Sequence, residues 1–168
     1  MDYVFVDLET TGLTPKNAYI IGIGATKVRN GKTVANFETY VRCPAPIPEE
    51  ITALTGILEE HLVGAPELKE ALQAFFDFGR DCTLVGYHLS FDDAFLTYYA
   101  KAAGLEYEGV FCRKIDALPL AEQVLSEKLK KFYMRSVAEY FKIPYCRSDC
   151  LTDAIITAKV YEKLEGKA

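Results

Sequence analysis

The chain has 168 residues, half of them apolar, with ten Phe and eleven Tyr, which suffices for one ordinary domain and excludes intrinsic disorder. Its 24 acidic residues outnumber the 19 basic ones, so a broad basic surface of the kind that coats duplex DNA is not expected. No apolar run approaches the roughly 20 residues of a membrane-spanning helix, and the first residues lack the basic start of a signal peptide. We therefore expect a single cytoplasmic domain over residues 1–168 that does not enter a membrane.

Strand signals dominate the first forty residues. Residues 3–8 alternate and are rich in β-formers, residues 18–28 hold a dense Ile/Gly/Ala run, and residues 33–41 follow the turn Asn30-Gly31. Two hairpin-linked strands after the first predict an antiparallel part of a sheet. Repeated prolines predict a loop over residues 43–50.

Helical periodicity follows. After Pro66, apolar residues recur on one helical face until Gly79, and residues 83–87 predict a short strand. Further helices are predicted around residues 91–99, over residues 134–141 and over residues 151–164. The pattern predicts an α/β layer fold, in which a mixed sheet carries helices on its faces.

Two acidic residues end the first predicted strand. Side chains two apart in a strand point to the same face, so Asp7 and Glu9 should project together where the apolar strand gives way to Thr10-Thr11-Gly12. Two carboxylates on one face of a layer fold repel each other and resist removal from water. Either a divalent cation resolves this conflict, or the strand frays at Asp7 and both acids are solvated.

Further acids lie near the start of two predicted helices. Asp153 belongs to a segment that is apolar over most of its circumference and is therefore expected to pack on the sheet. Asp92 and Asp93 follow the short strand at residues 83–87. Helix N-termini favour negative charge, which is one explanation for these acids, and metal ligation is the other.

Together these residues resemble a known family. Residues 4–13, with Asp7-Leu-Glu9-Thr10-Thr11-Gly12 inside them, are similar to the first motif of the DEDD (DnaQ-like) 3′–5′ exonucleases. The segment Gly86-Tyr-His88-Leu-Ser-Phe91-Asp92 is similar to the second motif and selects Asp92 over Asp93, and Asp153-Ala154 resembles the third. Ile47-Pro48 and Leu54-Thr55-Gly56-Ile57 also match the DnaQ-like branch. The resemblance spans nearly the whole chain and implies a ribonuclease-H-like fold, a five-stranded mixed sheet flanked by helices.

The resemblance also implies an activity. Four carboxylates, those of Asp7, Glu9, Asp92 and Asp153, would be the catalytic residues and would hold two Mg²⁺ or Mn²⁺ ions for two-metal hydrolysis of a phosphodiester bond. The substrate would be the 3′ end of single-stranded nucleic acid, DNA or RNA. The residues expected to contact it are Thr10, Thr11, Gly12, Leu13, His88 and Phe91. A homodimer and a polymerase-associated subunit are both consistent with this resemblance.

The chain departs from the family at the general base. The DnaQ-like branch places a His five residues before the last Asp, where this chain has Ser148, and a sister branch places a Tyr four residues before it, where this chain has Asp149. Serine without an activating partner is no base near neutral pH. Asp149 is a weak candidate whose alternative role is to cap the last helix, and Tyr145 is offset. The base therefore stays unassigned, and losing one typically lowers a rate by about 10²–10⁴-fold.

Two interpretations of function stay open at this point. In the first, the chain is a metal-dependent 3′–5′ exonuclease, slow because its base is displaced or missing, and its four retained acids favour this interpretation. In the second, it is a catalytically impaired exonuclease-like module that binds a nucleic-acid end or a protein partner, and the missing base favours that.

Two other groups have less specific interpretations. Lys128, Lys130, Lys131 and Arg135 interleave with Phe132 and Tyr133, a pattern found both in single-strand binding and on solvated helix faces. Cys146 and Cys150 lie four apart with no His nearby, so reduced thiols are expected there rather than a zinc site.

Overall fold

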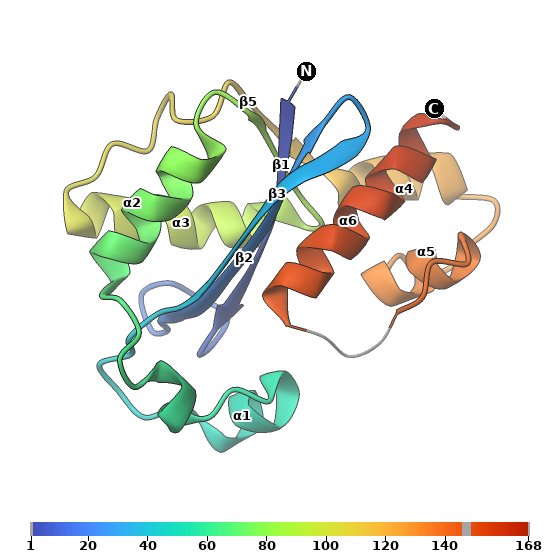
Figure 1. The fold of residues 1–168 in the computed structure, drawn as a ribbon. Coiled ribbons are helices and arrows are strands. Elements are labelled where there is room, and N and C mark those ends of the chain that lie inside the picture. Colours follow the sequence, from blue (N-terminus) through green and yellow to red (C-terminus); the bar gives the residue numbers. More distant parts are fainter. Residues whose placement is uncertain (1, 146–148, 168) are drawn as a thin grey trace.

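The structure is a computed structural model, which describes residues 2–145 and 149–167. Its five strands form one sheet in the order β3-β2-β1-β4-β5 (Figure 1). The first three strands, which pair antiparallel, are β1 (Asp2–Thr10), β2 (Ile20–Arg29) and β3 (Lys32–Tyr40). On the other side of β1 lie β4 (Thr83–Gly86) and β5 (Arg113–Asp116), which pair parallel. The predicted mixed five-stranded α/β fold is therefore confirmed.

Helices cover both faces of the sheet (Figure 1). The helices are α1 (Glu49–Thr55), the 3₁₀ helix η1 (Glu59–Leu62), α2 (Leu68–Gly79), α3 (Leu89–Ala103), α4 (Ala117–Leu125), α5 (Met134–Tyr140) and α6 (Cys150–Glu165). The main core lies between the sheet and the pair α2 and α3, whereas α6 packs on the opposite face and is itself covered by α4 and α5. Within the part of the chain that the structure describes, no helix is both long enough and apolar enough to cross a membrane.

The alternation of β1 decides which side chains face α6. Val4, Val6 and Leu8 point into the main core. Tyr3 and Phe5 point the other way and contact the ring of Tyr161 on α6, with ring centroids 5.8 and 5.7 Å from it. Because side chains two apart share a face, the next two members of this second row are the acids at positions 7 and 9. The apolar pairing of β1 with α6 thus directs both carboxylates toward the start of that helix.

The start of α6 lies directly against β2 at Gly24. A Cβ atom at this position would lie 2.2 Å from the carbonyl carbon of Cys150 and 2.2 Å from the amide nitrogen of Leu151, so no larger residue fits without moving backbone. Gly24 is also the residue that pairs with Asp7 in the β1–β2 ladder. This close approach brings the first turn of α6 over the acidic end of β1.

Most predicted elements are present, with ends shifted by a few residues. Four elements were not expected: the helices α1, η1 and α4, and the strand β5. Three of the four residues of β5 are charged, so its sequence carries no strand pattern. The predicted loop over residues 43–50 is wrong in its last two residues, because Glu49 begins α1. Pro48 precedes that helix with φ −56° and ψ 140°, a conformation that proline favours and that leads into a helix.

Candidate active site

Three carboxyl groups converge where β1 meets the start of α6. Asp7, Glu9 and Asp153 each place one carboxylate oxygen within 4.8 Å of the others, and all three side chains are partly buried. β1 does not fray at Asp7, since it stays paired with β2 as far as Thr10. The solvated-strand alternative is therefore wrong, and the expected common face for Asp7 and Glu9 is confirmed.

The fourth acid of the predicted set lies beside this cluster rather than in it. Asp92, in the first turn of α3, is only 4 % exposed, and its Oδ1 accepts the backbone N–H of Leu8 at 3.1 Å. Leu8 lies beyond Phe5, the last residue of β1 that pairs with β4, so Asp92 satisfies an otherwise unpaired strand edge. Asp93 is engaged elsewhere, with the hydroxyl of Tyr107 and with the Lys114 ammonium at 2.8 Å. Asp92 and Asp93 therefore have different partners, and the choice of Asp92 as a metal ligand stays a prediction.

Crowding and burial make two of these acids, Asp7 and Asp92, hard to ionise. Burial, reinforced by the carboxylates of Asp92, Asp153 and Glu9, raises the pKa of Asp7 well above its usual range. Burial also raises the pKa of Asp92 to about 8, although the N–H of Leu8 opposes the shift. A divalent cation would relieve this repulsion, and hard carboxylate oxygens are the ligands that Mg²⁺ and Mn²⁺ favour. The residues present therefore fit a divalent metal, and the cluster is a candidate metal site.

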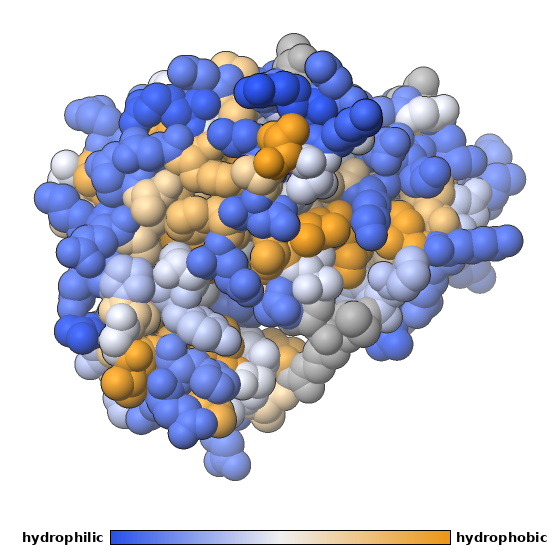
Figure 2. Space-filling view, in the orientation of Figure 1, coloured by the Kyte–Doolittle hydropathy of each residue, from blue (hydrophilic) through white to orange (hydrophobic). Residues whose placement is uncertain are grey.

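The cluster opens into a cleft of about 760 Å³. The exposed side of α1 forms one wall of the cleft, and α5 with the segment after it forms the other. Figure 2 shows the surface hollowed between the α1 end of the molecule and the start of α6. The described residues that line the cleft are Asp7, Leu8, Glu9, Glu50, Ala53, Leu54, Thr55, Arg135, Tyr145 and Asp153. Arg135 is the one basic side chain in this set; its Nε donates to Glu139 at 3.1 Å, and its guanidinium lies 6.0 Å from the ring centroid of Tyr145.

The predicted substrate contacts fall into two groups. The four residues after Glu9 form a turn beside the cluster: Thr10 donates its hydroxyl to the carbonyl of Gly12 at 2.7 Å, and the hydroxyl of Thr11 accepts the N–H of Tyr19 at 2.8 Å. Leu13, at the tip of this turn, is 85 % exposed. Leu13 therefore exposes a large apolar side chain to solvent, and contact of this turn with a substrate stays a prediction.

His88 and Phe91 are not among the described residues that line the cleft. His88 is exposed with φ 65°, and its N–H donates to Asp116 Oδ1 at 2.9 Å. Phe91 is half-buried against the main core, with its ring centroid 5.0 Å from that of Phe95. Contact of these two residues with a substrate therefore stays a prediction.

The candidate general base is engaged in capping α6. Asp149 Oδ1 accepts the N–H of Thr152 at 2.7 Å, which is the N-cap role set against catalysis above. Partial burial raises the pKa of Asp149, but the hydrogen bonds from Thr152 outweigh it and hold that pKa below the usual range. A carboxyl with a lowered pKa is a weaker proton acceptor. Ser148 and Cys146 lie outside the described residues, while the Cys150 thiol is buried and its pKa is raised by that burial.

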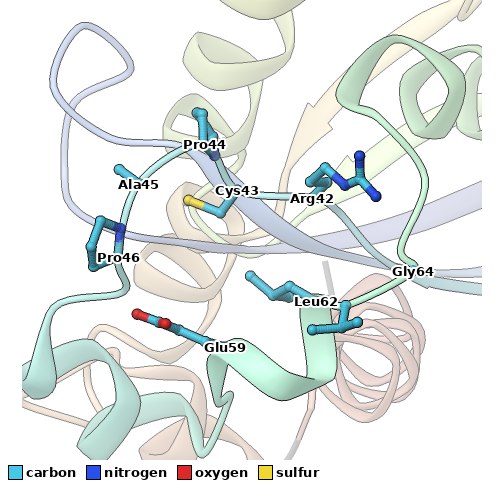
Figure 3. A pocket seen from close by; sticks show the side chains of 9 residues that line it. Arg42, Cys43, Pro44, Ala45, Pro46, Glu59, Leu62 and Gly64 are labelled. Carbon is cyan, nitrogen blue, oxygen red and sulfur yellow. The ribbon is translucent and has the colours of Figure 1, made fainter.

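A separate cavity of about 490 Å³ lies between residues 42–46 and η1 (Figure 3). Its two charged residues already have partners: Arg42 pairs with Glu67 at 2.8 Å, and Glu59 accepts the N–H of Ile47 at 3.3 Å. Its remaining described lining is apolar or uncharged, including Cys43, Pro44 and Leu62. This cavity therefore lacks the grouped carboxylates that distinguish the cleft.

Comparison with known proteins bears directly on this geometry. The family model described as "Exonuclease" (RNase_T) matches residues 4–161, nearly the whole chain. The chain belongs to this exonuclease family. Among its relatives, the PolC-type DNA polymerase III of Caldanaerobacter subterraneus subsp. tengcongensis is 37% identical over 99% of the exonuclease chain, which spans 12% of that polymerase. The DNA polymerase III subunit epsilon of Aquifex aeolicus is 33% identical over 96% of it, which spans 79% of that subunit.

Solved structures share the fold of this exonuclease chain. Exonuclease X in complex with 5′ overhanging duplex DNA superposes with a TM-score of 0.76 at 20% identity, covering 99% of the exonuclease chain and 92% of exonuclease X. E. coli exonuclease I in complex with a dT13 oligonucleotide superposes with a TM-score of 0.85 at 14% identity, covering 99% and 41% of the respective chains. The ribonuclease-H-like exonuclease fold implied by the motifs is thus confirmed.

Sequence reasoning missed part of the cleft of this exonuclease domain. Glu50 lines the cleft, although nothing in the sequence marked it. Leu54 and Thr55 belong to a segment quoted only as a resemblance, and Leu54 is 66 % exposed at the cleft wall. No sequence signal marks these residues as cleft residues, because their position depends on how α1 packs beside the end of β1.

Proposed function

We propose that this exonuclease domain removes nucleotides one at a time from the 3′ end of single-stranded nucleic acid, with two Mg²⁺ or Mn²⁺ ions as cofactors. The observation that carries the proposal is the convergence of three carboxylates within 4.8 Å at one end of an open cleft. Carboxylates grouped this closely repel one another and resist removal from water, which a divalent cation would relieve. Binding of cations and, through them, of phosphate would explain why these acids are grouped.

The metal ligands in this proposal are Asp7, Glu9, Asp92 and Asp153. Bound cations would supply the positive charge that a phosphodiester needs and would lower the pKa of an attacking water. The protein's own part is to hold the carboxylates rigidly. β1 fixes Asp7 and Glu9, the close packing of α6 on Gly24 fixes Asp153, and the N–H of Leu8 fixes the orientation of Asp92.

Side chains around the cleft would position the strand end. Leu13 and Leu54 are 85 % and 66 % exposed and offer apolar surface for the terminal base. Arg135 lines the same cleft and supplies a cation for a phosphate. The turn of residues 10–12 offers backbone groups to the sugar. Together these groups suit one nucleotide end rather than a long duplex.

The comparisons make DNA the first substrate to test. Two relatives carry the name of DNA polymerase III, and two structures that share the fold hold DNA. We therefore propose that the domain acts in the cytoplasm on the 3′ end of a DNA strand, in association with a polymerase. RNA and a homodimer are alternatives that the experiment below addresses.

The test is the cleavage of 5′-labelled single-stranded DNA and RNA oligonucleotides with Mg²⁺ or Mn²⁺, with Asp7→Ala as control. A ladder that shortens from the 3′ end with the native chain but not with Asp7→Ala supports the proposal and identifies the sugar. Light scattering of the same samples reports the oligomeric state. No ladder from folded protein that still binds the oligonucleotide would overturn the proposal in favour of a binding module.

A second variant addresses the missing base. Ser148→His restores the residue that the DnaQ-like branch carries at this position. If the chain is an exonuclease without its base, this variant should cleave faster by up to about 10²–10⁴-fold. An unchanged rate would mean that another group already accepts the proton. A folded variant that binds metal and cleaves nothing would contradict the enzyme proposal.

A further inference from the structure

A second cleft, of about 520 Å³, lies on the other side of the start of α5. It is formed by the turn between β4 and α3, the first turn of α4, and the segment that leads into α5. Its lining residues are Tyr87, His88, Leu118, Glu122, Lys130, Lys131, Phe132, Tyr133 and Met134. We call the cleft beside Asp7, Glu9 and Asp153 the metal cleft. Four acids are among its described lining residues, whereas the second cleft has two lysines and one glutamate.

The lysines of this second cleft are available to a ligand. Lys130 and Lys131 are exposed, and neither takes part in any ion pair within residues 2–145 and 149–167. Tyr133 beside them is 68 % exposed, which is unusual for a large aromatic ring. Two free cations next to an exposed ring are the elements that bind a phosphodiester backbone and stack a base.

The segment that carries these residues is anchored. The hydroxyl of Tyr87 donates to the backbone carbonyl of Phe132 at 2.5 Å. Phe132 and Met134 pack against the apolar core between α4, α5 and α6. On the opposite wall, the N–H of His88 is bound to Asp116, which also accepts the N–H of Leu118 at 3.0 Å. The cleft is therefore held open by contacts that do not use its lysines or Tyr133.

The two clefts adjoin at consecutive residues. Met134 lines the second cleft and Arg135 lines the metal cleft, so the start of α5 is the ridge between them. A strand whose 3′ nucleotide occupies the metal cleft has to leave it in some direction. The direction past Arg135 leads from one cation to the two lysines without crossing the acidic cluster.

We propose that the second cleft binds the nucleic-acid strand on the 5′ side of the nucleotide being removed, with Lys130 and Lys131 contacting phosphates and Tyr133 stacking on a base. The carboxylate of Glu122 repels phosphate, so the phosphates would bind on the side of the cleft near the lysines. This inference rests on the proposed function, because it assumes that the 3′ end lies at the carboxylates. It adds a subsite that sets the preferred length of the substrate.

The test compares a substrate that reaches both clefts with one that reaches only the metal cleft. The first is a thymidine hexanucleotide and the second is the p-nitrophenyl ester of thymidine 5′-phosphate, which has no nucleotide beyond the scissile bond. In Lys130→Ala/Lys131→Ala we expect KM for the hexanucleotide to rise about tenfold or more while kcat/KM for the ester stays unchanged. The slope of log KM against log salt should fall by about 1.4, because each phosphate contact to a single strand contributes about 0.7.

A matched control removes the same charge elsewhere. Lys69 and Lys163 are exposed lysines that lie outside this basic segment and do not line the second cleft, so Lys69→Ala/Lys163→Ala changes net charge equally. Tyr133→Ala should raise KM for the hexanucleotide about tenfold, and Tyr133→Phe should not. An equal rise in KM in the lysine control, or a KM that is insensitive to all of these variants, would overturn the inference. An effect seen only with duplex substrates would overturn it in favour of a complementary-strand contact.

The inference and the proposed function fail in different ways. If the native chain cleaves neither substrate, the exonuclease proposal fails, and fluorescence anisotropy of the labelled hexanucleotide then decides the inference on its own. Weaker binding by Lys130→Ala/Lys131→Ala than by the lysine control supports a strand-binding cleft. Equal binding by the two variants overturns it.

Discussion

At the scale of single residues, the distinctive feature is acids that the fold holds close together. Asp7 has a pKa well above its usual range because it is buried among three other carboxylates. Asp92 is 4 % exposed and has its pKa raised to about 8. Because the folded state disfavours ionisation of these groups, the free energy of unfolding depends on pH. This dependence can be measured without a substrate.

The metal-free protein should lose stability as the pH rises. An unfolded Asp titrates near about 3.9, whereas folded Asp92 titrates at about 8. Between these values the folded state binds more protons than the unfolded state, so the free energy of unfolding falls with pH, by roughly 1.4 kcal/mol per pH unit for each such group. Urea unfolding in EDTA at pH 5, 6.5 and 8 measures this. A flat or rising profile would contradict it, and Asp92→Asn should flatten the slope.

Neutralising one acid of the cluster should raise the stability of the metal-free protein and lower its activity. Asp7→Asn removes one charge from a repelling group, so we expect a higher melting temperature than that of the native chain in EDTA at pH 8. The same variant should lose cleavage by about 10³-fold or more and lose the thermal stabilisation by Mn²⁺. Glu127→Gln, an exposed change of equal charge, should alter neither property. A destabilised Asp7→Asn chain would show that the carboxylate has a structural partner.

At the scale of elements, the site depends on how closely α6 approaches the sheet. Gly24 leaves no space between β2 and the backbone at Cys150 and Leu151. The helix also has a side-chain cap, from Asp149 to the N–H of Thr152 at 2.7 Å, that fixes its first turn. Both contacts act on the turn that carries Asp153. Changes at either place should therefore reach the acidic cluster without touching it directly.

Gly24→Ala should displace the start of α6. Its new Cβ would meet backbone atoms at 2.2 Å, so either the helix or the strand has to move. We expect a loss of about 1–3 kcal/mol of stability, as for other overpacked sites, and a weaker Mn²⁺ affinity measured by calorimetry because Asp153 moves with the helix. In Gly166→Ala the new Cβ meets its nearest atom at 3.6 Å, an ordinary contact, and the change should be tolerated. Unchanged Mn²⁺ affinity in Gly24→Ala would show that the packing does not position Asp153.

Asp149 offers a test of capping against proton transfer. Asp149→Ser keeps an N-cap oxygen but removes the carboxylate, whereas Asp149→Ala removes both. If Asp149 only caps α6, the Ser variant should match the native chain in stability and in kcat. The Ala variant should lose about 1 kcal/mol in urea unfolding. A fall in kcat that is as large in the Ser variant as in the Ala variant would instead identify Asp149 as the base.

At the scale of the whole molecule, a net charge of −5 opposes the approach of nucleic acid. On the face drawn in Figure 2, polar residues surround a band of apolar residues that crosses the middle of the molecule. Binding of a strand end should therefore depend on cations at the acidic cluster. Anisotropy of a labelled hexanucleotide should show weak binding in EDTA and tighter binding with Ca²⁺. Asp7→Asn/Asp153→Asn should lose this difference, and equal binding by the native chain in both conditions would contradict the expectation.

The sequence predicted the fold and the members of the acidic cluster for physical reasons that can be named. Strand alternation placed Asp7 and Glu9 on one face, and a mostly apolar helix implied that Asp153 packs on the sheet. The distance between them could not be predicted, because it depends on backbone packing at Gly24. The second cleft could not be predicted from the sequence either. Its walls come from segments more than forty residues apart, joined by the bond from Tyr87 to Phe132.

The acidic cluster joins the two ends of the described chain. Asp7 and Glu9 lie on the first strand, and Asp153 lies on the last helix. During synthesis, the ribosome releases the first two acids long before the third. A nascent chain that lacks α6 therefore has no complete cluster, whatever part of the sheet has already formed. If the cluster cleaves nucleic acid as proposed, the growing chain cannot cleave a strand until α6 has emerged and docked.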